Sequence, residues 1–185
     1  MTLARNIFLA RKAINYVNKE IGVLSLNTIN VDSYADILTL EDYQRAMLNM
    51  RQIINDTVER REFHHFENTG ELSNNNMLYK IIARSAYASK FHLGNCSEKA
   101  AIAFSRLKFL GARPLDIFLL IDEHQARNNH SFVVLGRTNG IPQQPSTWNH
   151  EATICDAWGD QAYPSYLYDN HISFAGTLTL LYRYS

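Results

Sequence analysis

Cysteine is scarce in this chain of 185 residues, which contains only Cys96 and Cys155. No Cys-x-x-Cys pair is present, so the sequence lacks both a zinc knuckle and a disulfide framework, and a reducing compartment fits this cysteine content. Histidines do not supply a metal site instead, because the neighbouring His64 and His65 would point in different directions on a helix. We therefore expect no metal ion and no other cofactor.

An excess of charge of one sign is also absent, because 18 Lys and Arg residues balance 18 Asp and Glu residues. Nucleic acids and anionic lipid surfaces are usually bound through basic patches, so we expect no nucleic-acid partner. Long apolar runs are missing as well, since Arg11, Lys12 and Lys19 interrupt the N-terminal stretch. We expect no Sec-type signal and no membrane span. A cytoplasmic location and export by a specialised secretion system both fit.

The residues that are present suit one globular domain or one domain with a small lobe, since 46% are hydrophobic. Apolar residues recur every three or four positions over residues 3–21 and again from Thr39 to about Glu62, which predicts two helices. The apolar stripe of the first helix indicates packing on the body, with docking of a protein partner as the alternative. A polar loop over residues 67–76 and a third helix from Met77 are expected next.

The pattern changes after residue 110, where short β-prone runs are bounded by turn residues. These runs predict strands over Leu115–Ile121, Ser131–Leu135, Ala152–Cys155 and Leu178–Tyr184. We therefore predict an α+β fold with a helical lobe over residues 1–90. Residues 91–185 would form a core in which a cysteine-bearing helix packs on an antiparallel sheet, and the two parts would make one compact unit.

Cys96 is predicted to open the helix that carries this core. Asn95 is a suitable N-cap, and Glu98 stands where it can bond back to the N–H of the cap. Cys96 then becomes the first helical residue, where unpaired N–H groups and the helix dipole stabilise a thiolate. The same N–H groups can bind an oxyanion, so Cys96 is a candidate nucleophile. A buried structural cysteine is the alternative.

His130 and Asp156 are the candidate partners of this thiol. His130 opens a predicted strand at the rim of the sheet, where an imidazole could act as general base, although His124 and His150 lie in similar polar loops. Asp156 ends a predicted strand and could orient the imidazole, with Asp160 and Asp169 as rivals. The list is completed by Trp158, which could form a wall of the cleft or shield the bond between histidine and aspartate.

The short segments Gly94-Asn95-Cys96, His130-Ser131-Phe132-Val133-Val134 and Cys155-Asp156-Ala157-Trp158 resemble those of the papain-like and transglutaminase-like superfamily. Within it they look like bacterial effector cysteine proteases of the YopT type and the RavJ-like effectors. The resemblance covers residues 90–165. It implies Cys96 as nucleophile, His130 as general base and Asp156 as orienting acid. Papain-type enzymes place an oxyanion-binding glutamine six residues before the cysteine, where this chain has Lys90. Asn95 is therefore the nearest amide candidate for that role.

These observations predict a thiol-dependent hydrolase or acyltransferase. The leading interpretation is a cysteine protease that a bacterium secretes into the host cytoplasm, where it acts on a host protein. A transglutaminase or a glutamine deamidase with the same triad is the first alternative, because cleft shape and water access select the acceptor of the acyl group. The second alternative is a catalytically silent module that binds a protein partner through the N-terminal helix or the cleft.

Overall fold

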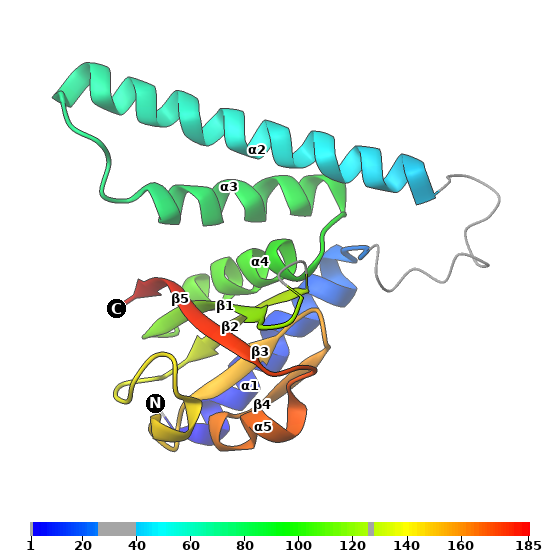
Figure 1. Ribbon diagram of the computed structural model, residues 1–185, viewed down its shortest axis with the longest axis vertical. Coiled ribbons are helices and arrows are strands. Elements are labelled where there is room, and N and C mark those ends of the chain that lie inside the picture. Colours follow the sequence, from blue (N-terminus) through cyan, green and yellow to red (C-terminus); the bar gives the residue numbers. More distant parts are fainter. Residues whose placement is uncertain (1, 26–39, 126–127) are drawn as a thin grey trace.

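The computed structural model describes residues 2–25, 40–125 and 128–185 and has an α+β architecture (Figure 1). These residues form five α-helices and one five-stranded antiparallel sheet, which is the broad class that the sequence predicts. The helices are α1 (Leu3–Asn15), α2 (Leu40–Thr69), α3 (Asn76–Phe91), α4 (Cys96–Phe109) and the short α5 (Tyr168–His171). The strands are β1 (Leu115–Asp122), β2 (Asn129–Leu135), β3 (Thr153–Asp156), β4 (Gln161–Pro164) and β5 (Gly176–Tyr184).

The ends of the N-terminal helices differ in part from the prediction. Helix α2 continues to Thr69, so the expected end near Glu62 and the first part of the expected polar loop are wrong. Asn68 and Thr69 donate side-chain hydrogen bonds to backbone carbonyls one turn earlier, and Gly70 follows with a positive φ that ends the helix. Helix α1 passes into a π-helical turn, Tyr16–Ile21. The predicted start at Thr39 lies outside the described residues.

The sheet has the order β4-β3-β2-β1-β5, and every neighbouring pair is antiparallel. The four predicted strands are present within one or two residues of their expected ends, whereas β4 was missed. Its four residues lie at the edge of the sheet and end at Pro164. A run this short that ends in proline does not stand out as a strand in the sequence.

Apolar side chains cover both faces of the sheet. On one face, α1 and α4 pack against Ile117, Val133 and Cys155, and the larger hydrophobic core extends from there to α2 and α3. On the other face, Phe118 and Phe132 belong to a second cluster that Trp148 and α5 help to cover. The pair α2 and α3 lies on the side of α4 away from the sheet (Figure 1). Helix α4 is therefore held between the sheet and two further helices.

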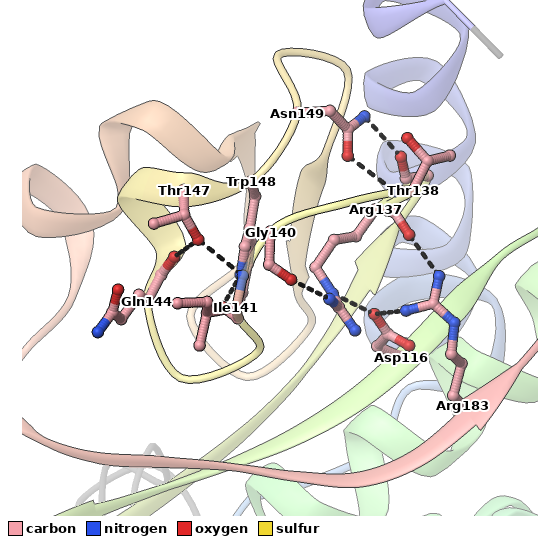
Figure 2. Close-up of polar contacts among 11 residues, drawn as sticks. Asp116, Arg137, Thr138, Gly140, Ile141, Gln144, Thr147, Trp148, Asn149 and Arg183 are labelled. Carbon is pink, nitrogen blue, oxygen red and sulfur yellow. Dashed lines mark hydrogen bonds and ion pairs between the residues drawn. The ribbon is translucent and has the colours of Figure 1, made fainter.

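One end of the central strands is fastened by a buried ion pair (Figure 2). Arg137, which follows β2, donates from Nε to Asp116 Oδ2 at 2.6 Å, and both side chains are almost fully buried. Arg183 of β5 lies 3.4 Å from the same oxygen. The guanidinium of Arg137 also lies over the rings of Phe118 and Trp148. These contacts join β1, β2 and β5 at the end of the sheet away from His130.

No helix within residues 2–25, 40–125 and 128–185 has the length and apolar character needed to cross a bilayer.

Candidate active site

Helix α4 begins at Cys96, as the sequence predicts. Asn95 and Glu98 form the expected capping box, in which the Asn95 N–H donates to Glu98 Oε2 at 3.0 Å and the Asn95 side chain accepts from the Glu98 N–H. The first N–H groups of a helix have no acceptor inside the helix. The N–H groups of Cys96 and Ser97 are therefore in position to bind negative charge beside the thiol.

The capping carboxylate is also the centre of an ion-pair cluster that the sequence did not indicate. Glu98 is fully buried and accepts two parallel hydrogen bonds from Arg51 of α2, at 3.0 and 2.9 Å. Arg84 Nε of α3 lies 3.7 Å from Glu98 Oε1. A bidentate, charge-assisted pair of this kind fixes geometry as well as energy. The first turn of α4, and with it Cys96, is thereby anchored to both neighbouring helices.

Cys96, the first residue of α4, lies beside the beginning of β2 and is partly exposed. Its Sγ is 3.9 Å from the carbonyl oxygen of Asn129, and the next residue, Ser97, makes a hydroxyl contact of 3.1 Å with Ser131. Burial by itself raises the pKa of the Cys96 thiol. The His130 imidazole, the Ser131 N–H and the Ser97 hydroxyl outweigh burial and lower that pKa below its ordinary value. These contacts therefore favour ionisation of the thiol.

His130 and Asp156 meet because of the register of β2 and β3. Val133 pairs with Cys155, so continuing the register sets Asp156 opposite Phe132 and makes His130 its diagonal neighbour on the same face of the sheet. The His130 Nε2 and Asp156 Oδ2 atoms are 2.8 Å apart. Since Nε2 faces the carboxylate, the Nδ1 side of the ring is the one available to Cys96.

The pKa of His130 reflects this arrangement. Burial by itself would lower the pKa of the imidazole, since the side chain is only 9% exposed. The hydrogen bond to Asp156, the interaction with Cys96 and the negative charges of both groups outweigh burial and raise the pKa to about 9. The three side chains therefore favour an imidazolium at neutral pH, and they allow the Cys96 thiol to ionise at a lower pH than a free thiol.

The Asp156 carboxylate is held by the turn that follows it. Its Oδ1 accepts hydrogen bonds from the N–H groups of Trp158 and Gly159, at 3.1 and 3.0 Å. A Cβ at position 159 would lie 2.7 Å from Asp156 Oδ2, so only glycine leaves room for the carboxylate. Asn18 donates to the carbonyl oxygen of Ala157 and accepts from the Lys99 ammonium, which links this turn to α4.

Trp158 packs edge-on against the His130 ring, with ring centroids 5.5 Å apart. Its Nε1 donates to the Ser25 hydroxyl at 3.0 Å, and Ser25 donates in turn to Asn95 Oδ1 at 3.0 Å. The turn after β3 and the cap of α4 are therefore linked through one hydroxyl. Since Asn95 Oδ1 serves as the cap and accepts from Ser25, any oxyanion contact from this amide would come from Nδ2.

The rival residues lie elsewhere. His124 is exposed in the loop after β1, and His150 stacks on Tyr166 at a centroid distance of 5.2 Å. Asp160 accepts from Asn18 rather than from a histidine. The second cysteine, Cys155, is buried against the carbonyl oxygen of Ala10, and burial raises the pKa of its thiol, in agreement with the predicted packing role. Nowhere in the described ranges do three or more His, Cys, Asp or Glu residues gather as metal ligands would.

Sequence reasoning missed several residues of the site, among them Ser25, Arg51 and Arg84. Ser25 is 70 residues from its partner Asn95, and Arg51 is 47 residues from Glu98. Nothing local marks them, because serine and arginine are ordinary residues of loops and helix surfaces. A buried glutamate could not be inferred from a capping position alone, since most caps face solvent.

Comparisons of the chain with models of protein families, with curated proteins and with solved structures found no match.

Proposed function

We propose that the protein is a cysteine hydrolase that cleaves an amide bond in a polypeptide through an acyl-enzyme on Cys96. The observation that supports this proposal is the meeting of three side chains: the Cys96 thiol at the start of α4, the neighbouring His130 imidazole, and Asp156 at 2.8 Å from His130 Nε2. A nucleophile, a base and a group that orients the base are the parts required for nucleophilic catalysis. The papain-like relationship remains part of this proposal.

In the acylation step, the Cys96 thiolate attacks the carbonyl carbon and a C–S bond forms. The oxyanion of the tetrahedral intermediate faces the N–H groups at the start of α4. The C–N bond then breaks, and the leaving amine takes a proton from the His130 imidazolium. Asp156 keeps the ring in the orientation needed for this transfer and stabilises its charge.

In the second step, His130 accepts a proton from water as the water attacks the thioester. The C–S bond breaks, a carboxylic acid is released, and the thiolate and imidazolium form again. If a primary amine takes the place of water, the same site is a transglutaminase, and if the bond attacked is a glutamine side-chain amide, it is a deamidase. The short motifs that resemble those of bacterial effector proteases extend the proposal to a secreted effector with a host protein as substrate.

The pH dependence of alkylation tests the central part of this proposal. We expect iodoacetamide to label Cys96 with an apparent pKa well below about 8.5, the value of a free thiol. Mass spectrometry of the labelled peptide assigns the site, and the buried Cys155 serves as an internal control that stays unlabelled in the folded protein. An apparent pKa near 8.5, with no rate advantage over a free thiol, would instead support the binding module.

The variant Cys96→Ala should fold normally and lose every activity of the wild-type protein, because the side chain lies at a partly exposed helix start. Unfolding of this variant would indicate a structural cysteine.

Treatment of a lysate with the enzyme and a tagged primary amine shows whether water or an amine accepts the acyl group. New peptide termini support proteolysis, and tagged glutamines support amine transfer.

A further inference from the structure

A pocket of about 320 Å³ lies next to Ser97, the residue that follows Cys96, on the side of β1 and β5. Two of its lining residues are neighbours of the candidate triad. Ser97 follows Cys96, and the carbonyl oxygen of Asn129 lies beside the Cys96 sulfur. His130, Asp156 and Trp158 lie on the opposite side, toward β3. The pocket therefore adjoins the reacting thiol without being part of the triad.

The pocket combines an apolar floor with positive charge. Leu119, Ile121 and Leu181 are half-buried along the sheet, and Lys80 and Arg84 of α3 line the pocket across from them. No acidic side chain belongs to the described lining. A ligand that fits this surface has an aliphatic portion and a negatively charged end.

The two cations are not fully neutralised by the residues around them. Glu98 is shared between Arg51, which takes both of its oxygens, and Arg84, which remains 3.7 Å away. Arg84 Nε is buried and has no hydrogen-bond acceptor in the described part of the chain. Among the described residues, Lys80 forms no ion pair with a carboxylate. Both arginines contact Glu98, two residues after Cys96, so this positive cluster lies at the start of α4.

We propose that this pocket is a specificity site for an acidic side chain, glutamate in particular, on the residue whose carbonyl Cys96 attacks. The aliphatic stem of glutamate would lie on Leu119, Ile121 and Leu181, and its carboxylate would meet Lys80 and Arg84. The inference rests on the proposed function and names the substrate class for it, a polypeptide with an acidic residue at the cleaved bond. Charge-assisted contacts to a partly desolvated ammonium and guanidinium provide the selectivity.

Lys80 is the residue to test, because it is half-exposed and the Glu98 cluster does not depend on it. The probes are iodoacetate and iodoacetamide, which differ chiefly in charge. The ratio of their rates at Cys96 cancels any change in thiolate content. We expect Lys80→Gln to lower the ratio of iodoacetate to iodoacetamide about threefold, and Lys80→Glu to lower it roughly tenfold, from the Coulomb energy of one and two unit charges at such range.

Lys108→Gln is the matched control. It removes the same charge from a position twelve residues along α4, about 18 Å from Cys96, where salt at 0.1 M screens its effect. Its ratio should equal that of the wild-type protein. An unchanged ratio in the folded Lys80→Glu variant would overturn the proposal.

A second pair of probes tests the side chain itself: two tripeptide chloromethyl ketones that differ only in Glu or Gln next to the reactive group. Both alkylate Cys96 without turnover. We expect the Glu probe to react about three times faster or more with the wild-type protein, and Lys80→Glu to reverse the order. Equal rates for both probes would contradict the pocket while leaving the hydrolase intact. A thiol no more reactive than free cysteine toward all four reagents would contradict the hydrolase itself.

Discussion

At the scale of single residues, the thiol and the imidazole change each other's protonation. Burial alone would keep both Cys96 and His130 neutral, since it raises the pKa of the thiol and lowers that of the imidazole. Their proximity reverses both tendencies, and Asp156 adds a second negative group for the imidazole. Both shifts favour a thiolate–imidazolium pair, which is the state that the proposed nucleophilic attack requires.

For the proposed hydrolase, the dependence of activity on pH follows from these shifts. Activity should rise with pH as the thiol ionises, at a pH below the usual thiol pKa, and should fall again as the imidazolium is lost near pH 9. Alkylation needs only the thiolate, so it should rise in the same way and then stay level above pH 9. A decrease in both rates at high pH would contradict this assignment.

Asp156→Asn should weaken the thiolate–imidazolium pair of Cys96 and His130 through its effect on His130. The carboxylate raises the pKa of His130, so its replacement by an amide lowers this pKa and moves the alkaline limit of activity toward neutral pH. With less imidazolium present, the pKa of Cys96 should rise. We expect a loss of kcat of at least about tenfold, as general acid–base contributions usually reach about 10² to 10⁴. The check is NMR titration of the His130 ring together with the pH dependence of alkylation.

At the scale of elements, the proposed hydrolase requires a rigid start of α4, because a displacement of about 1 Å can cost two orders of magnitude in rate. Three sets of contacts hold it. Glu98 ties it to α2 and α3, Lys99 ties it to the turn after β3 through Asn18, and Asn95 ties it to Trp158 through Ser25. Cys96 is therefore positioned by neighbours from most of the chain.

Glu98→Gln should show how much of this rigidity comes from the buried carboxylate. The variant leaves the partly buried guanidinium of Arg84 and the bidentate donors of Arg51 without a negative partner. Loss of one partner of a buried ion pair typically costs about 3–5 kcal/mol. Because Arg51 is partly exposed, we expect the free energy of unfolding to fall by about 2–4 kcal/mol, measured by urea unfolding. Glu59→Gln, an exposed change on α2, is the control and should shift stability by less than about 0.5 kcal/mol.

At the scale of the whole molecule, the sheet carries the candidate site at one end and a structural ion pair at the other. Asp116 and Arg137 fasten one end, and His130 lies opposite Leu120 at the other, four residues farther along β1 and thus about 14 Å away. Apolar pairs of β1 and β2 fill the distance between them. Changes at the structural end should therefore alter stability without altering the chemistry of the thiol.

Arg137→Met tests this separation. Removing the guanidinium leaves Asp116 buried beside Arg183 alone, at 3.4 Å, so we expect a loss of about 3 kcal/mol in the free energy of unfolding. The apparent pKa of Cys96 in the folded protein should stay at its wild-type value. Alkylation kinetics below the melting temperature provide the measurement. A shifted thiol pKa in the folded variant would mean that the two ends of the sheet are coupled.

The sequence by itself determined the local features of the site. Asn95, Cys96 and Glu98 form the predicted cap because capping depends only on residues three or four positions apart. The four main strands follow from short β-prone runs, and the broad α+β class follows from the order of helices and strands. Strand β4 and the end of α2 were not predicted, since an edge strand of four residues and a helix extended by side-chain caps leave weak periodic signals.

Only the tertiary structure decided which side chains lie together. The register between β2 and β3 selects Asp156 over its rivals as the partner of His130. If the pairing of these strands shifted by one residue, His130 and Asp156 would lie on opposite faces of the sheet. The burial of Glu98, the link through Ser25 and the basic pocket beside Cys96 depend on contacts between residues far apart in the chain. Such contacts result from packing of complete elements, and no local pattern in the sequence encodes them.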